Sequence, residues 1–185
     1  ESLPVAQGRT YGLKRVLDVV GALAAIIILA PVMLFVAAAV ALTSKGPVIF
    51  KQTRLGKGGV PFAFYKFRSM VTNSDDAVHR QFVADVIKSQ QQGGGSGGAA
   101  PYKLQSDSRI TRVGNIIRKT SLDELPQLFN VLKGDMSLVG PRPPIPDEVA
   151  QYERWQRRRL AMKPGLTCLW QISGRNELDF EQWMK

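Results

Sequence analysis

Residues 19–42 of this chain form an uninterrupted apolar run without a charged side chain. As one helix, rising ~1.5 Å per residue, it would be roughly 36 Å long, enough to cross a hydrocarbon core of ~30 Å. The run is too long and too uniformly apolar for a half-buried helix of a soluble protein. No small-residue cleavage site follows it, so a signal peptide fits less well. We therefore predict a membrane-associated segment.

Two features allow this segment either to span the bilayer or to turn back within it. Pro31 lies in the middle of the run and offers no N–H to the carbonyl of Ile27, so the helix should kink or break there. Both flanks are basic, whereas a simple span should show an imbalance of Lys and Arg. The residues alone leave open a kinked span and a re-entrant helix–break–helix within residues 1–45. The flanking basic residues are Lys14, Arg15, Lys45, Lys51 and Arg54.

The overall charge indicates an anionic partner. The chain has 25 Lys+Arg against 15 Asp+Glu, a net charge of +10, which suits nucleic acid, an acidic membrane or phosphorylated substrates. The single Cys168 excludes an intrachain disulfide, and the single His79 argues against a histidine-based triad or zinc site. Chemistry should therefore depend on carboxylates. Because the chain begins at Glu1, we expect it to be part of a longer protein.

Residues 46–185 are predicted to form one small α+β domain that is predominantly helical. Two apolar-aromatic runs, at 47–52 and 61–67, flank a Gly-rich turn and predict a β-hairpin. Residues 90–100 are rich in Gln and Gly and predict a flexible loop, whose GGGSGG core would also suit an engineered linker.

Apolar spacing predicts several helices in this domain. One has Ile110, Val113, Ile116 and Ile117 on one face, and the next carries Leu125, Leu128, Phe129 and Leu132 and ends at Gly134. The expected ranges are 75–89, 110–119, 125–133 and 147–162.

The adjacent acids Asp123 and Glu124 allow two interpretations. The structural one is that Ser121 and Glu124 form a capping box that begins a helix. The catalytic one is that a helix N-terminus attracts phosphate and keeps a carboxylate ionised. One acid could then attack phosphorus while the other holds Mg²⁺. The pattern leaves both open.

Basic residues near these acids could bind phosphate, although each alone is typical of a solvated surface. Arg142 differs, because Pro141 and Pro143 restrict the backbone on both sides of it. The candidates are Lys66, Arg68, Arg109, Arg112, Arg118, Lys119 and Arg142.

From about Lys14 to Asn176 the chain resembles the bacterial sugar transferase family, the monotopic polyprenyl-phosphate phosphoglycosyltransferases. The most specific stretch is 118–143, which includes Asp123 and Glu124. Cys168 stands where the family usually has Gly. The other matching stretches are the start of the apolar run broken at Pro31, 65–70, 108–114, 163–167 and 170–176.

The resemblance implies a re-entrant hairpin on the cytoplasmic face of the bacterial inner membrane. It also implies transfer of a phosphosugar from a UDP-sugar to polyprenyl (undecaprenyl) phosphate, the first membrane step of bacterial exopolysaccharide, capsule, O-antigen or glycoconjugate synthesis. Asp123 would carry the phosphosugar covalently in a ping-pong reaction that releases UMP first, and Glu124 would hold Mg²⁺. The resemblance places Lys66, Arg68, Arg112, Arg118 and Arg142 around the phosphates, and Pro141, Pro143, Gln171 and Arg175 in a substrate-binding loop.

Three other functions explain less. A membrane-surface module that binds anionic lipid does not require the Asp123–Glu124 pair. Nucleic-acid binding has no recognisable motif here and leaves the apolar run unexplained, so no nucleic-acid partner is expected. An ordinary glycosyltransferase would release UDP in place of UMP. The residues do not identify the sugar, and they leave open a homo-oligomer.

Overall fold

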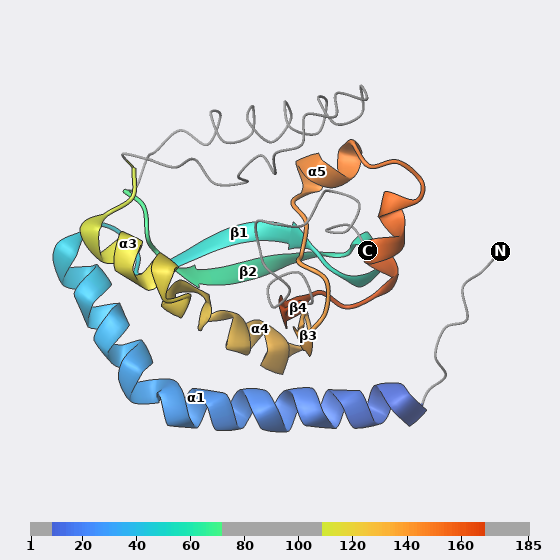
Figure 1. Cartoon of the computed structure of the whole chain (residues 1–185), viewed down its shortest axis with the longest axis horizontal. Helices are drawn as coiled ribbons and strands as arrows, with labels where there is room; N and C mark the ends of the chain where they lie inside the picture. The colour runs from blue at the N-terminus through green and yellow to red at the C-terminus, as the bar shows by residue number, and fades with distance from the viewer. Residues whose placement is uncertain (1–8, 72–108, 169–185) are drawn as a thin grey trace.

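The computed structural model describes residues 9–71 and 109–168, which combine a long helix with short sheets and shorter helices (Figure 1). The predicted α+β class, with more helix than strand, is confirmed. The predicted helix 75–89, the loop 90–100, Gln171 and Arg175 lie outside the described residues. The elements before the gap are α1 (Arg9–Thr43), β1 (Ile49–Leu55), the 3-10 turn η1 (Lys57–Gly59) and β2 (Pro61–Phe67).

The elements after the gap are shorter. They are α3 (Arg112–Lys119), the 3-10 turn η2 (Leu122–Glu124), α4 (Gln127–Lys133), β3 (Ser137–Val139), α5 (Pro146–Ala150), the 3-10 segment η3 (Gln156–Ala161) and β4 (Gly165–Thr167).

Helix α1 continues through Pro31, and the predicted break is not seen. Figure 1 shows that the helix bends past its middle, as expected where proline removes a backbone hydrogen bond. Packing keeps the two halves helical, because Ala22 lies in one hydrophobic cluster and Val36 and Val40 lie in another. The re-entrant arrangement stays a prediction, as does a division between residues 1–45 and 46–185.

The predicted hairpin is confirmed. Strands β1 and β2 pair antiparallel, with Gln52 opposite Phe64 and Arg54 opposite Phe62. The Gly-rich turn between them contains Gly58 and Gly59 at positive φ, a conformation that glycine adopts without strain.

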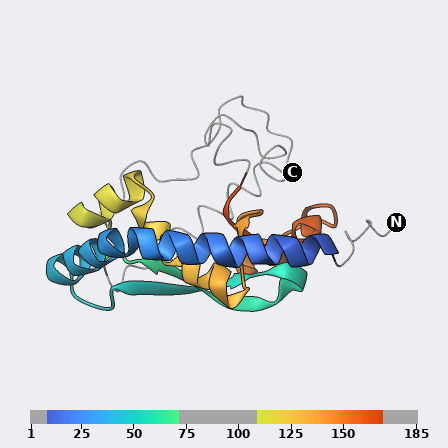
Figure 2. The same cartoon turned by 90° about the horizontal axis from the view of Figure 1, so that it is seen from below.

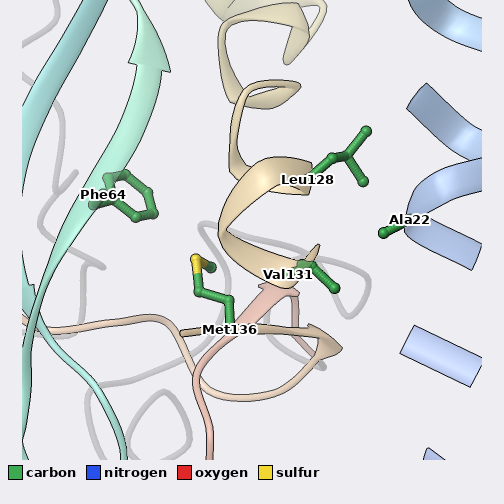
Figure 3. Packing of buried hydrophobic residues seen from close by; sticks show 5 residues of the cluster. All are labelled: Ala22, Phe64, Leu128, Val131 and Met136. Carbon is green, nitrogen blue, oxygen red and sulfur yellow. The ribbon is translucent and has the colours of Figure 1, made fainter. Parts of the chain in front are cut away.

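Helix α4 lies between α1 and the hairpin (Figure 1), and Figure 2 shows α1 extending along most of the described part. Figure 3 shows the core that results, with Leu128 and Val131 of α4 between Phe64 of the hairpin and Ala22 of α1. Gly134 at φ 93 ends α4, as predicted. The membrane-type helix therefore shares a core with the rest of the chain.

A second cluster joins the other half of α1 to α3. Val36, Val40, Phe67 and Ile117 are buried together. The predicted apolar face of residues 110–119 is wrong at Ile116, which is 62% exposed. The helix turns Ile117 inward, and one short helix cannot bury both neighbours against one surface.

The single helix expected at 147–162 is wrong. The chain forms α5 and η3 instead, separated by a turn at the buried Tyr152. The side chain of Gln156 accepts the Glu153 N–H at 2.7 Å, a local bond that competes with a continuous helix. The parallel pair of β3 and β4 was not expected from the sequence.

Candidate active site

Asp123 and Glu124 lie in the 3-10 turn η2, ahead of α4 and not at its first residue. The predicted capping box is wrong, because Ser121 adopts a left-handed conformation (φ 59) and its side chain caps nothing. The Glu124 N–H donates to the Ser121 carbonyl at 3.1 Å. This tight turn buries Asp123, which is 7% exposed, and leaves Glu124 half-buried.

Lys66 of β2 joins the two carboxylates. Its Nζ lies 2.8 Å from Oε1 of Glu124 and 3.8 Å from Oδ2 of Asp123. The strand brings this cation to the acids from a distant part of the sequence. The structure thus brings Lys66, Asp123 and Glu124 together.

The environment of Asp123 makes its charge unfavourable. Burial raises the pKa of the Asp123 carboxyl above its ordinary value; Lys66 opposes this, Glu124 adds to it, and Arg118 opposes it. Because burial prevails, the ionised carboxylate is less stable here than in water. A buried acid with a raised pKa beside a cation is typical of a reactive group.

The other predicted phosphate-binding residues divide by position. Arg118, at the end of α3, is close enough to act on Asp123. Arg112 is exposed in the first turn of the same helix, and Arg142 is exposed between the buried Pro143 and the half-buried Pro141. These side chains are available to a ligand.

Arg68 is used elsewhere. It is 5% exposed, and its Nη2 donates to the carbonyls of Ser44 at 2.6 Å and Val40 at 3.3 Å, while Nη1 donates to the carbonyl of Pro47. These acceptors belong to the last turn of α1 and the chain just beyond it. The structure therefore places Arg68 at the end of the long helix and outside the acid cluster.

The segment 141–144, which we name the proline loop, is held by its carbonyls. The Gly165 N–H donates to Pro141 at 2.9 Å, and the Leu55 N–H donates to Pro144 at 3.0 Å. The Arg142 carbonyl accepts from Arg159 Nη2 at 3.5 Å, and the Pro143 carbonyl accepts from Arg54 Nη1 at 3.0 Å. The bonds come from β1, η3 and β4, so three separate elements fix the backbone around Arg142.

The role of Arg54, which is 9% exposed and holds this loop, was not predicted from the sequence. Nothing in its local pattern distinguishes it from the other basic residues near the hairpin. The close approach of Gly140 and Gly165 was not predicted either. The two backbones are so close that a Cβ on Gly165 would lie 2.0 Å from the Gly140 nitrogen.

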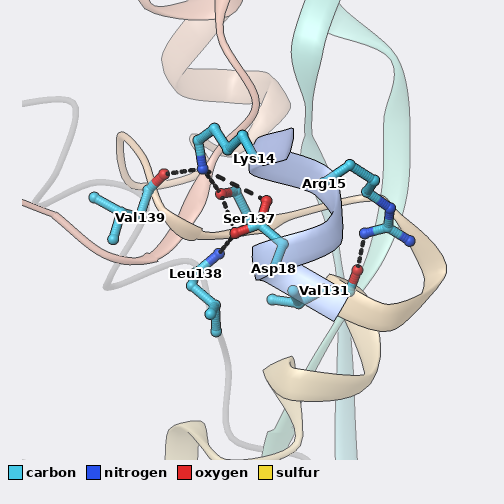
Figure 4. Close-up of polar contacts among 7 residues, drawn as sticks. All are labelled: Lys14, Arg15, Asp18, Val131, Ser137, Leu138 and Val139. Atoms are coloured by element: carbon cyan, nitrogen blue, oxygen red, sulfur yellow. Dashed lines mark hydrogen bonds and ion pairs between the residues drawn. The ribbon is translucent and has the colours of Figure 1, made fainter. Parts of the chain in front are cut away.

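The start of α1 is joined to the same domain by polar contacts (Figure 4). Oδ1 of the buried Asp18 accepts from Ser137 Oγ at 2.9 Å and from the Leu138 N–H at 3.0 Å. Lys14 bonds to Ser137 and pairs with Asp18. Arg15 donates to carbonyls at the end of α4, including Val131 at 2.6 Å. This role of Asp18 was not predicted, although a carboxylate directly before an apolar run is a signal that could have indicated it.

The rest of α1 is strongly apolar and exposed. Among the described residues, Gly12–Thr43 is long and apolar enough to cross a membrane by length and composition. Exposed apolar side chains on this scale are typical of a membrane or protein contact. They include Leu13, Leu17, Val20, Leu23, Ile27, Ile28, Leu34, Phe35 and Leu42.

Comparisons with known proteins identify the family. Residues 9–185 match the family described as Bacterial sugar transferase. The chain is 47% identical to the undecaprenyl-phosphate galactose phosphotransferase of Salmonella typhimurium, over 91% of this chain and 34% of that protein. It is 47% identical to the galactosyl transferase CpsE of Streptococcus agalactiae, over 93% and 36%.

A shorter relative is covered more fully. The exopolysaccharide production protein ExoY of Rhizobium meliloti is 40% identical over 90% of this chain and 71% of its own length. The chain thus spans about a third of the first two relatives and most of the third. It belongs to the bacterial sugar transferase family.

Proposed function

We propose that this chain transfers a phosphosugar from a UDP-sugar to a polyprenyl phosphate. The Asp123 carboxylate attacks the phosphorus that bears the sugar, the bond from that phosphorus to the UMP oxygen breaks, and UMP leaves. An oxygen of polyprenyl phosphate then attacks the same phosphorus and releases Asp123. The products are UMP and a polyprenyl-diphosphate sugar. The names of the relatives support this reaction class and its use in polysaccharide synthesis.

The observation that carries the proposal is the buried Asp123 that shares Lys66 with Glu124. Burial disfavours the charge of Asp123, so attack on phosphorus relieves an unfavourable ionised state. Lys66 and Arg118 offset negative charge beside the acids, and Arg142 extends from the proline loop as a further phosphate ligand. Positioning and electrostatics of this kind supply most of the catalysis in phosphoryl transfer.

The residues fit a Mg²⁺ site that is completed by substrate. The described residues contain no group of three or more His, Cys, Asp or Glu side chains that could hold a metal. Mg²⁺ is usually bound through one or two carboxylates together with substrate phosphates and water. Glu124, which is half-buried, would hold the ion, with Asp123 next to it. When bound, Mg²⁺ neutralises charge on the phosphate oxygens.

We further propose that the exposed face of α1 contacts lipid on the cytoplasmic side of the membrane. Both ends of the helix are bonded to the rest of the chain, through Asp18 near the start and through the Val40 carbonyl, which accepts from Arg68, near the end. A helix held in this way favours a monotopic arrangement over a span. Cysteines placed at Gly12 and Lys57, with Cys168 replaced by Ser, should both react with a label from the cytoplasmic side only. Labelling at position 12 from the periplasmic side would overturn the arrangement.

Mass spectrometry tests the chemistry directly. The intact chain, incubated with Mg²⁺ and a UDP-sugar but no lipid acceptor, should gain one phosphosugar and release one UMP. UDP-galactose is the first donor to try, because a relative is named for galactose. Asp123→Asn should show no adduct, whereas the matched control Asp147→Asn, which removes an exposed charge in α5, should behave like the parent. Adduct formation on Asp123→Asn, or release of UDP, would refute the proposal.

A further inference from the structure

The prolines of the proline loop have no N–H to donate. The loop is therefore held in place through its carbonyls, which accept hydrogen bonds from other segments. Of its four carbonyl contacts, two come from adjacent residues at the end of β1, the Arg54 guanidinium and the Leu55 N–H. The Leu55 bond is ordinary backbone pairing. The Arg54 bond differs from ordinary backbone pairing, because it requires a cation to be buried inside the protein.

Burial and the nearby Arg142 charge lower the pKa of the Arg54 guanidinium to about 10. A buried guanidinium is unfavourable unless its N–H groups are bonded. Arg54 uses two of its edges, because Nε donates to Gln52 Oε1 at 3.1 Å and Nη1 donates to the Pro143 carbonyl at 3.0 Å. A lysine ammonium has no planar fork and cannot reproduce this pair of fixed directions.

Arg54 also lies near the Lys66 cation of the acid pair, because both side chains approach the Phe64 ring. Its Cζ is 5.4 Å from the centroid of the Phe64 ring, and Lys66 Nζ is 5.5 Å from the same centroid. The charges of Arg142 and Glu124 both act on Arg54. The cation that holds the loop and the cation that joins the carboxylates therefore both lie close to one aromatic ring.

We propose that Arg54 is a positioning residue, which fixes the proline loop through Pro143 so that the Arg142 side chain faces a phosphate bound at Asp123 and Glu124. The inference rests on the proposed function, since that function supplies the phosphate. Arg54 touches no substrate in this account and acts only through the loop.

Amide hydrogen exchange tests the hold on the loop without any substrate. The Gly165 N–H donates to Pro141, and the Gly140 N–H donates to Thr167 at 3.0 Å, at the far end of the loop from Arg54. Arg54→Lys should speed exchange at these two amides by roughly tenfold. The Arg68 N–H, which donates to Val48 at 2.9 Å, serves as the internal reference and should not change.

A double-mutant cycle tests the link to Arg142. Arg54→Lys and Arg142→Lys each keep the charge, and each should lower kcat/KM for UMP release by about 100-fold. The double variant should lose little more than the worse single variant, within about threefold, because both changes remove the same positioned group. Arg157→Lys, on η3, is the matched control and should keep the parent kinetics.

The outcomes separate the two proposals. If the parent releases no UMP from any UDP-sugar, the proposed function fails, while the exchange result still judges the role of Arg54. Unchanged exchange at Gly140 and Gly165 overturns the inference. So does a double variant whose loss equals the product of the single losses. If Arg54→Lys loses cooperative unfolding, Arg54 is a stability residue and the inference is overturned as well.

Discussion

The contact of Asp18 with β3 should contribute a large part of the stability of this chain. Asp18 is 6% exposed and accepts two hydrogen bonds, from Ser137 Oγ and the Leu138 N–H. A hydrogen bond to a charged group contributes about 1.5–3 kcal/mol. We therefore expect Asp18→Ala to lower the free energy of unfolding by about 3–5 kcal/mol, since it leaves both donors without their acceptor.

Two further variants separate the hydrogen bonds that Asp18 accepts from the contacts of Lys14. Asp18→Asn keeps an acceptor oxygen and should cost about 1–2 kcal/mol. The Lys14 side chain is 49% exposed and lies 3.5 Å from Asp18, so its pair is screened by water. Lys14→Met should therefore cost about 1 kcal/mol or less.

Thermal unfolding in lipid nanodiscs measures these differences. For a chain of this length, about 1 kcal/mol shifts the midpoint by roughly 2–4 °C, so Asp18→Ala should melt roughly 10 °C below the parent. The expected order of loss is Asp18→Ala, then Asp18→Asn, then Lys14→Met. A midpoint for Asp18→Ala within about 2 °C of the parent, or an equal loss for Lys14→Met, would refute the reasoning.

Three other predictions follow from single residues. Burial raises the folded-state pKa of Asp123, so the ionised carboxylate lowers the stability of the folded chain above that pKa. Asp123→Asn should therefore raise the unfolding midpoint at neutral pH, and this gain should vanish on acidification. Arg68→Met removes donors from the end of α1 and should lower stability by about 3 kcal/mol in denaturant titrations; an unchanged midpoint would contradict this. Pro31→Leu restores a backbone N–H, so spin labels at Leu13 and Leu42 should move apart as α1 straightens, and an unchanged distance distribution would show that packing alone bends the helix.

The sequence predicted the elements that are determined by residues close to one another in the chain. The hairpin followed from two apolar runs around glycines, and the end of α4 followed from Gly134, whose positive φ suits the residue. The capping box failed because the sequence spacing of Ser121 and Glu124 does not determine backbone conformation. Ser121 turned out left-handed, which moved the acids into a 3-10 turn.

Contacts between distant segments could not be predicted in the same way. Strands β3 and β4 are three residues each, and they pair only because Gly140 and Gly165 let two backbones approach closely. From the sequence, Arg54 was one of the basic residues that flank the apolar run, and Arg68 was one of the phosphate-binding candidates. Only the fold shows that each is buried against carbonyls of a different segment, whereas Lys66 reaches the acid pair.

The bonds at both ends of α1 would also affect how the proposed active site meets polyprenyl phosphate in a membrane. A helix joined to its domain at one end could swing, and the distance from the acid pair to the headgroups would then vary. Here β3, which bonds to Asp18, leads within two residues into the proline loop. The depth of α1 in a bilayer would therefore also determine the height of Arg142 and Asp123 above the headgroups. The rate of turnover would then depend on the thickness of the membrane.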